Sequence, residues 1–210
     1  EAPGPLETGL KTFFNVSPIP EKWTEEYVES YLREYNNIAI KILSIHEAYP
    51  GHYYQMNYTK QNPSIFRVIF GSEVMIEGWA HYCEKMMIDT GLDGENNYYK
   101  IVQLKWALRG IIDAIIDQKI HAYNMAREEA VNLMVNHGFQ ELPEAERKWA
   151  RAQLTSCQLS TYFIGASELN RLRKDVELKS GAAFNLKSFH EKILIQGAIP
   201  IRYLRTIILD

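Results

Sequence analysis

The spacing of hydrophobic residues along most of this chain is typical of α-helices. Apolar side chains recur every three or four positions, as at Tyr27, Tyr31, Ile38, Ile42 and Ile45, and this period places them on one helix face. Proline and glycine interrupt the pattern where helices usually end. We therefore expect helices over about 21–49, 64–90, 97–125, 127–136, 143–155, 159–179 and 186–196, a short helix around 53–55, and a last one after Pro200.

The first twenty residues have a different pattern, because they are rich in proline and glycine. Only the run 12–16, Thr-Phe-Phe-Asn-Val, is a candidate strand, and Pro18 and Pro20 end it. No repeat, low-complexity tract or linker is evident along the chain. The prediction is an all-α, mainly helical fold with a minor N-terminal β-strand or hairpin, in a single domain over residues 1–210.

Composition excludes several classes of function. The 210 residues include 46% hydrophobic ones and carry a net charge of −3, and no basic block suggests nucleic acid or a membrane surface. No apolar run reaches the length of about 20 residues that a membrane span needs. Cys83 and Cys157 form no disulfide framework and are expected to be buried free thiols. The first residues lack a signal-peptide pattern, but the chain does not begin with Met, so the compartment stays open, with a soluble cytoplasmic protein favoured.

The segment 46–52, His-Glu-Ala-Tyr-Pro-Gly-His, carries the most informative motif. Neutral imidazole and carboxylate bind zinc well, and a catalytic zinc site keeps one position for water. In the usual zinc-protease helix the two histidines lie four positions apart, on one face. Here His52 follows His46 by six positions, which in an unbroken helix is a rotation of about 240°. The two imidazoles would then point away from each other.

Pro50 and Gly51 offer a solution to this geometric problem. Pro50 has no N–H to give to the carbonyl of His46, and Gly51 tolerates backbone angles that other residues avoid. A bulge at this point could return His52 to the face of His46. The zinc hypothesis therefore depends on this helix breaker.

Carboxylates near the two histidines complete the candidate site. Glu47 directly follows the first histidine, the position of a general base that takes a proton from water and delivers it to the leaving group. Glu77 lies in an apolar stretch, where a carboxylate is costly to bury unless it is paired or bound to metal. His81 follows Glu77 by one helix turn, as a partner for a ligand or a pocket residue, and Gly78 would let another helix approach closely. The alternative is that His46 and Glu47 are surface residues, and that the glutamates of this helix, Glu73, Glu77 and Glu84, form a solvated stripe.

The two motifs resemble the C-terminal part of the zinc-peptidase-like family known as domain of unknown function 885. Its hallmarks are a His-Glu-Ala-x-Pro-Gly-His segment and a later Glu-Gly-Trp-Ala segment, found here at 46–52 and 77–80. Weaker similarities extend the resemblance over nearly the whole chain: residues 2–5 and 13–16, the Tyr-x-x-Gly run at 162–165, and residues 189–190 and 197–200. Many members have a second histidine directly after the first motif, where this chain has Tyr53.

The resemblance implies a helical, zinc-dependent, peptidase-like fold, akin to thermolysin-type enzymes whose third ligand is a glutamate. Carried over by position, His46, His52 and Glu77 are the Zn²⁺ ligands and Glu47 is the base. Family members are usually much longer, so a helical N-terminal portion is missing here or lies on a companion chain. The expected substrate is a peptide or small amide, and a carboxypeptidase-like action is one option. The alternatives are a non-catalytic module that binds a peptide or partner, and a zinc amidase acting on non-peptide amides.

Several further residues are weaker candidates. Tyr162 could stabilise the oxyanion through its phenol O–H, although a core tyrosine on an amphipathic helix explains it equally well. His121, one turn after Asp117, could contact substrate or form a structural pair. Arginines could receive a substrate carboxylate or lie solvated on the surface, and aromatic residues near the motifs could line a pocket or pack between helices. These are Arg171, Arg173 and Arg202, and Tyr49, Tyr53, Tyr54, Trp79 and Tyr82. His137 and His190 are expected at helix ends or on the surface.

Overall fold

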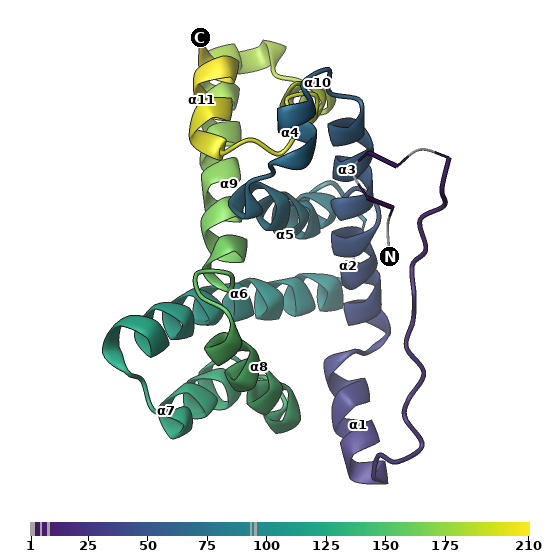
Figure 1. The fold of residues 1–210 in the computed structure, drawn as a ribbon, viewed down its shortest axis with the longest axis vertical. Helices are drawn as coiled ribbons and strands as arrows, with labels where there is room; N and C mark the ends of the chain where they lie inside the picture. The colour runs from purple at the N-terminus through teal and green to yellow at the C-terminus, as the bar shows by residue number, and fades with distance from the viewer. Residues whose placement is uncertain (1–2, 5, 8, 93, 95) are drawn as a thin grey trace. The chain divides into compact units, whose positions relative to one another are not determined.

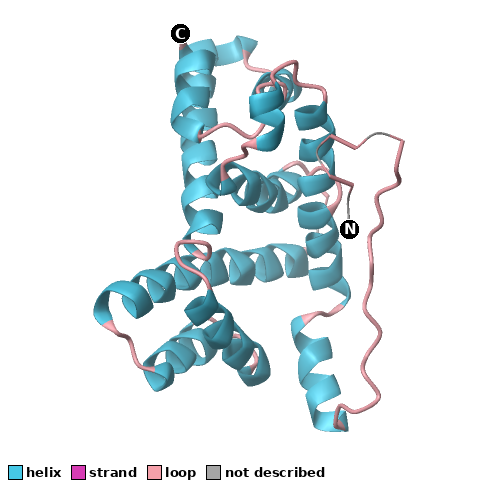
Figure 2. Ribbon diagram, viewed as in Figure 1, coloured by secondary structure: helices cyan, strands magenta, loops and turns pink. Residues whose placement is uncertain are grey.

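A computed structural model describes residues 3–4, 6–7, 9–92, 94 and 96–210. Every regular element within these residues is helical, which confirms the all-α prediction (Figures 1 and 2). None of the described helices is both long enough and apolar enough to span a membrane. The helices are α1 Glu25–Glu34, α2 Asn37–Glu47, α3 His52–Lys60, α4 Ile65–Ile69, α5 Glu73–Asp89, α6 Asn97–Tyr123, α7 Arg127–Asn132, the π-helix η1 Leu133–His137, α8 Leu142–Leu154, α9 Ser160–Ser180, the 3₁₀-helix η2 Gly181–Ala183, α10 Leu186–Leu194 and α11 Ile201–Leu209.

The predicted N-terminal strand is wrong. Residues 12–16 have no regular structure, and Phe13, Phe14 and Val16 are exposed. A strand needs a neighbouring strand to pair its backbone groups, and the described part of the chain contains none. The β-propensity of these residues is therefore not sufficient to form a strand here.

Two long predicted helices are each divided in two. The expected helix over 21–49 is interrupted after α1, where the side chain of Asn36 accepts hydrogen bonds from the backbone N–H groups of Ile38 and Ala39 and so begins α2. The expected helix over 64–90 is interrupted between α4 and α5, where the N–H of Ser72 donates to the carbonyl of Ala198 at 2.7 Å. The first break has a local capping signal in the sequence. The second depends on a partner far along the chain.

The chain divides into two compact units, and the boundaries fall after residue 14 and within α2, α5 and α9. Unit 1 comprises residues 1–14, 45–84 and 164–210, and unit 2 comprises residues 15–44 and 85–163. In unit 1, α10 contacts both α3 and α11. An ion pair between Arg205 and Asp175 joins α11 to α9. Fully buried side chains of this unit come from α5, α9, α10 and α11 and include Met75, Trp79, Leu169, Leu172, Ile193 and Leu204.

Unit 2 is organised around α8, which contacts α1, α6, α7 and η1. Its apolar core contains Ile112, Ile116, Met134 and Leu159, all nearly inaccessible to solvent. Charged side chains are also buried here in pairs: Glu34 of α1 accepts hydrogen bonds from Lys105 and Arg109 of α6, and Arg109 also pairs with Glu144 of α8. Buried charges need such partners, because an unpaired one costs several kcal/mol.

A close crossing of α5 and α9 positions the second motif within unit 1. A methyl group on Gly78 would lie 2.4 Å from the Cα of Gly165, and one on Gly165 would lie 2.0 Å from the carbonyl oxygen of Val74. Neither distance is possible for a real side chain, so both positions require glycine. The expectation that Gly78 permits a close helix approach is confirmed, and its partner is the glycine of the Tyr-x-x-Gly run.

We expect Gly165→Ala to destabilise the protein by about 1–3 kcal/mol, because the added methyl group must push two backbones apart. For a chain of this size that is a fall in melting temperature on the order of 2–10 °C, measurable by circular dichroism. Lys174→Ala, an exposed change on the same helix, is the control and should leave the melting temperature nearly unchanged. Equal melting temperatures for Gly165→Ala and the control would show that the crossing is looser than described.

Candidate metal centre

The first motif lies at a sharp bend between two helices. His46 and Glu47 are the last two residues of α2, and His52 is the first residue of α3. The N–H of Gly51 donates to the carbonyl of Ile45 at 2.9 Å, and α3 then begins with the N–H of Gln55 donating to the carbonyl of Gly51. The predicted helix break at Pro50 and Gly51 is confirmed.

Gly51 is the residue that makes this bend possible. A methyl group there would lie 1.8 Å from the carbonyl oxygen of His46 and 2.4 Å from that of Ile45. Such overlap with backbone atoms cannot be relieved by a side-chain movement. The last turn of α2 therefore packs directly on the Gly51 backbone, and only glycine fits.

The second motif holds the bend in place. The indole N–H of Trp79, on α5, donates to the carbonyl of Pro50 at 2.9 Å. Trp79 is 1% exposed, and the thiol of Cys83 lies 3.7 Å from the same carbonyl oxygen. Trp79 is thus a buried structural residue rather than a pocket wall, and it explains why the two motifs belong together. Cys83 is a buried free thiol as expected, whereas Cys157 is exposed, contrary to expectation.

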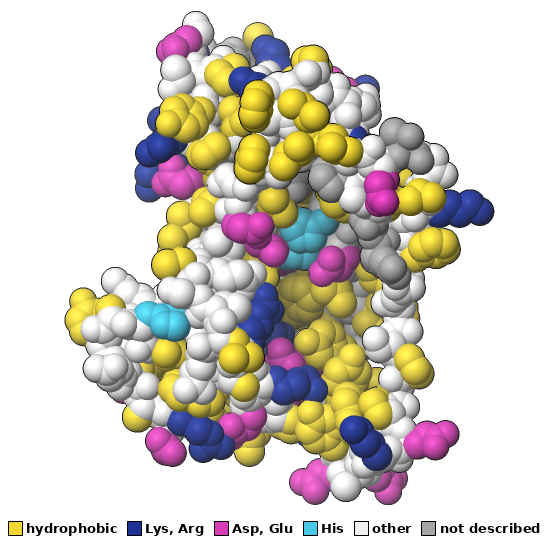
Figure 3. Space-filling model, in the orientation of Figure 1, with side chains coloured by type: hydrophobic (Ala, Val, Ile, Leu, Met, Phe, Trp, Pro, Cys, Tyr) yellow, Lys and Arg dark blue, Asp and Glu magenta, His cyan; other side chains and the backbone are white. Residues whose placement is uncertain are grey.

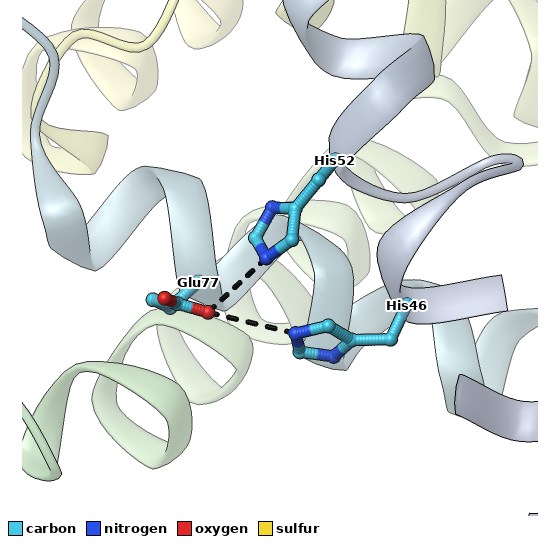
Figure 4. Close-up of side chains that lie close together, drawn as sticks. All are labelled: His46, His52 and Glu77. Atoms are coloured by element: carbon cyan, nitrogen blue, oxygen red, sulfur yellow. Dashed lines mark ion pairs between the residues drawn. The ribbon is translucent and has the colours of Figure 1, made fainter. Parts of the chain in front are cut away.

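The bend brings the three predicted ligands together. Figure 4 shows the imidazoles of His46 and His52 pointing at one carboxylate oxygen of Glu77, with ring centroids 4.7 Å apart. The Nε2 atom of His46 lies 3.5 Å from Glu77 Oε2, and the Nε2 atom of His52 lies 3.3 Å from the same oxygen. One ligand atom from each of the three residues falls within 4.8 Å of the others, so the group could hold a metal ion.

These distances suit a tetrahedral ion. Zinc lies about 2.0–2.1 Å from imidazole nitrogen and carboxylate oxygen, so two of its ligand atoms are about 3.3 Å apart at the tetrahedral angle. Both measured separations from Glu77 Oε2 are close to that value. This oxygen is also buried and accepts no hydrogen bond, and Nδ1 of His52 is a second buried atom without a hydrogen-bond partner. The three residues therefore fit Zn²⁺ in the type and spacing of their ligand atoms, and the Glu77 oxygen has no hydrogen bond that would compete with a metal ion.

Glu84 contacts the first ligand, His46, at the ring nitrogen that does not face Glu77. Its Oε1 lies 2.7 Å from Nδ1 of His46, and its Oε2 lies 3.1 Å from Nδ1 of His81. A proton on Nδ1 of His46, donated to Glu84, leaves the lone pair of Nε2 directed at the ligand group. His81 therefore pairs with Glu84. The signal missed in the sequence is that Glu77, His81 and Glu84, spaced by four and three, share one helix face.

The electrostatics of the metal-free cluster favour opposite charges side by side. Burial lowers the pKa of His46, but the carboxylates of Glu77 and Glu84 outweigh it and raise that pKa to about 10. Burial raises the pKa of Glu77, but the imidazoles of His46 and His52 outweigh it and hold it at about 2. The pKa of Glu84 is likewise about 2, because the imidazoles of His81 and His46 overcome the effect of its burial. Both carboxylates thus stay ionised at neutral pH, as a cation site requires.

Glu47 opens onto a pocket beside the ligands. The pocket has a volume of about 450 Å³, and its walls include Glu47, His52 and Glu77. Glu47 is exposed, so its carboxylate is accessible to water and to a ligand. Figure 3 shows acidic and histidine side chains meeting at the surface of the molecule. The arrangement therefore places a carboxylate that is not a ligand next to the candidate ion.

The weaker candidates have ordinary structural surroundings. Tyr162 belongs to unit 2, where its hydroxyl lies 3.1 Å from both Arg151 and Gln158, and its role as an oxyanion donor stays a prediction. Asp117, the partner proposed for His121, accepts hydrogen bonds from Ser160 and from the N–H of Cys157. His121 lies 3.7 Å from Asp117 and contacts the carbonyl of Ala152, which favours the structural alternative.

The arginines considered for substrate binding are paired within the described chain. Arg171 pairs with Glu168 on the surface, and Arg173 pairs with Glu177 on the same helix. Arg202 lies over the ring of Tyr203. These contacts favour the surface interpretation for Arg171 and Arg202. Arg173 instead also donates a hydrogen bond to the hydroxyl of the buried Tyr82.

His190 is half-buried in unit 1, contrary to the expected surface position. Its Nε2 lies 2.8 Å from the hydroxyl of Tyr82, and its ring meets that of Trp79 edge to face at a centroid distance of 5.3 Å. Arg173 donates to the same hydroxyl at 3.4 Å. Burial, with a smaller contribution from the Arg173 cation, lowers the pKa of His190 to about 4. The histidine is therefore neutral at neutral pH, and with its proton on Nδ1 its Nε2 accepts a hydrogen bond from the Tyr82 hydroxyl.

Comparison with known proteins now places the chain in a family. A family model described as "Bacterial protein of unknown function (DUF885)" matches residues 1–208. The chain belongs to the DUF885 family. This confirms the resemblance drawn from the two motifs. No protein with a curated description matches the chain.

Solved structures of two bacterial proteins resemble this DUF885 chain. A "putative lipoprotein of unknown function" from Shewanella oneidensis is 41% identical, with a TM-score of 0.91 over 100% of this chain and 38% of its own. A "putative lipoprotein" from Colwellia psychrerythraea is 25% identical, with a TM-score of 0.73 over 82% of this chain and 30% of its own. The present chain thus spans well under half the length of either relative.

We expect the buried neutral His190 to make stability fall as the pH drops from about 6.5 to about 4. The unfolded chain takes up a proton at the ordinary histidine pKa of about 6.5, whereas the folded chain resists protonation until about 4. The unfolded state therefore binds more protons in this window, which favours unfolding. His190→Gln should show a shallower loss of stability than the wild type in denaturant titrations between pH 7 and 4. Lys187→Gln, on the exposed face of the same helix, is the control; parallel pH curves for His190→Gln and wild type would contradict the assignment.

Proposed function

We propose that the protein is a zinc-dependent hydrolase, and specifically a metallopeptidase. The observation that carries this is the convergence of His46, His52 and Glu77 at tetrahedral spacing beside the accessible carboxylate of Glu47. A structural zinc site is closed by four protein ligands, whereas a catalytic one has three and an open position. Three donors next to a pocket favour the catalytic kind.

The chain's own residues supply the remaining chemistry. When bound, zinc lowers the pKa of a water ligand towards about 7 and polarises a carbonyl group. Glu47 takes the proton released by the attacking water and delivers it to the departing amine nitrogen. Glu84 holds His46 in the orientation and protonation state that binding requires.

The catalytic apparatus belongs to a larger protein in this proposal. Both solved relatives are much longer than the aligned part, so a further portion of the protein or a companion chain would complete the substrate cleft. We propose that residues 1–210 act as one catalytic domain, equivalent to the C-terminal part of the family. Because both relatives are described as a "putative lipoprotein", an envelope location is better supported than the cytoplasm.

Glu47→Gln should strongly slow peptide hydrolysis while leaving zinc bound, because the amide keeps the shape of the side chain but cannot accept the proton. We expect kcat to fall by on the order of 10² to 10⁴. The measurement is turnover of a peptide library by mass spectrometry, with zinc content determined by elemental analysis on the same samples. Glu73→Gln, an exposed glutamate on α5, is the matched control and should keep full activity. Unchanged turnover in Glu47→Gln would rule out the assigned base.

Glu84→Gln should weaken zinc binding without removing any ligand. The variant loses the negative charge that orients His46, and we expect affinity to fall by about 10- to 100-fold. His52→Ala, which removes a ligand, should lose more. Competition titration with a chromogenic chelator measures both, and circular dichroism checks that each variant is folded. If wild-type protein binds no zinc and chelation leaves its stability unchanged, the non-catalytic binding module becomes the better explanation.

A further inference from the structure

We propose that the pocket beside Glu47 binds the C-terminal end of a peptide, with the apolar wall holding the side chain of the released residue and Lys60 holding its carboxylate. This inference rests on the proposed hydrolase function and narrows it to carboxypeptidase action on peptides with apolar C-termini. The reaction is hydrolysis: the C–N bond breaks, the acyl carbon gains the hydroxyl of water and the amine nitrogen gains its proton.

The wall of the pocket is mainly apolar. Side chains from α3, α4, α5 and the loop before α11 form it: Met56, Val68, Ile69, Ile76 and Ala198. The volume of about 450 Å³ lies at the low end of the range for small-molecule sites. It therefore suits one or two residues rather than a long stretch of chain. An apolar side chain such as that of leucine or phenylalanine gains free energy by leaving water here.

The pocket runs along α3, and this gives it two chemically different ends. His52, Gln55, Met56, Thr59 and Lys60 all line it, and their spacing of three and four puts them on one helix face. The backbones of His52 and Lys60 are separated by eight residues, which is about 12 Å along the helix axis. The metal ligands and Glu47 therefore occupy one end, and Lys60 lies two turns away.

Lys60 is the only lysine or arginine among the described residues that line this pocket. Its ammonium group lies 3.5 Å from the carbonyl of Pro3, and no described carboxylate lies within ion-pair distance of it. A cation beside an apolar wall and without an anionic partner favours a ligand that brings its own carboxylate. Glu47 and Glu77 lie at the other end, so the carboxylates that line the pocket and the lysine that lines it are at opposite ends.

The distance along α3 fits a short released fragment. An extended peptide advances about 3.3–3.6 Å per residue. With the scissile carbonyl at the ligand end, a terminal carboxylate one or two residues further on lies about 4–7 Å away. The backbones of His52 and Lys60 are about 12 Å apart, and side chains on a helix lean towards its N-terminus, so the long side chain of Lys60 shortens the distance to be spanned. A peptide that continued past Lys60 would leave the ammonium without its partner.

The activity test uses the full-length, zinc-loaded protein and peptides that differ only at the C-terminus. The set ends in leucine, in leucinamide or in aspartate, and products are identified by mass spectrometry. We expect loss of one or two residues from the leucine peptide, and a kcat/KM lower by on the order of tenfold for the amide, which cannot pair with Lys60. Lys60→Met should remove the preference for the free carboxylate, and Lys60→Arg should retain it.

A binding test separates this inference from the proposed function. Metal-free protein is titrated with N-acetyl-leucine and with its amide, followed by NMR shifts, so that zinc cannot itself bind the carboxylate. Tighter binding of the acid, lost in Lys60→Met and kept in Lys60→Arg, supports the pocket assignment even if no peptide is cleaved. Absence of all cleavage with that binding pattern overturns the hydrolase proposal, and the carboxypeptidase action with it, but leaves the assignment of Lys60 as the carboxylate site standing. Equal binding and equal cleavage of acid and amide, or cleavage only at internal bonds, overturns the role of Lys60 and leaves the hydrolase proposal standing.

Discussion

The candidate centre depends on the packing of one helix end against a backbone without a side chain. The last turn of α2 can meet the start of α3 only because Gly51 has no Cβ, since a methyl group would lie 1.8 Å from the carbonyl of His46. Without that approach, a separation of six positions along a helix would direct the two imidazoles apart. Trp79 then fixes the bend through the carbonyl of Pro50, from the helix that also supplies Glu77. The hydrogen bond from Trp79 to Pro50 therefore links the bend to α5, the helix that carries the third ligand.

The second constraint is electrostatic. Glu84 is 1% exposed, and an isolated carboxylate at that depth would cost several kcal/mol. It is tolerated because His46 and His81 lie within 2.7 and 3.1 Å of its two oxygens. The contact with Glu84 also fixes the orientation of the His46 ring. The hydrogen bond that offsets the burial of Glu84 is therefore the one that aligns a metal ligand. Glu77 faces the opposite side of the His46 ring, where its buried oxygen has no hydrogen bond and is suited to a cation.

Local signals made part of this architecture predictable. The helical periodicity and the break at Pro50 and Gly51 were accessible from the sequence, because each is specified by residue types a few positions apart. The grouping of His46, His52 and Glu77 joins two motifs that lie far apart in the chain, and it was accessible through the resemblance of both motifs to one family. Features set by distant partners were not. The break before α5 depends on a hydrogen bond to the carbonyl of Ala198. The role of Trp79 depends on its hydrogen bond to the carbonyl of Pro50, and the burial of His190 depends on its contact with Tyr82. The strand failed for the same reason, since its β-propensity required a neighbour that the described chain does not provide.

The sharing of α3 between the ligand set and the pocket links metal binding to selectivity. His52 is the first residue of this helix and Lys60 the last, so one rigid element sets both the position of a ligand and the far end of the pocket. A helix of nine residues has little freedom to change that spacing, because its rise per residue is fixed at about 1.5 Å. The bend that brings His52 to His46 also aims the whole face of α3 along the pocket. A change at Gly51 would therefore alter the fit of a ligand to the apolar wall as well as the geometry of the ligands, although Gly51 does not line the pocket.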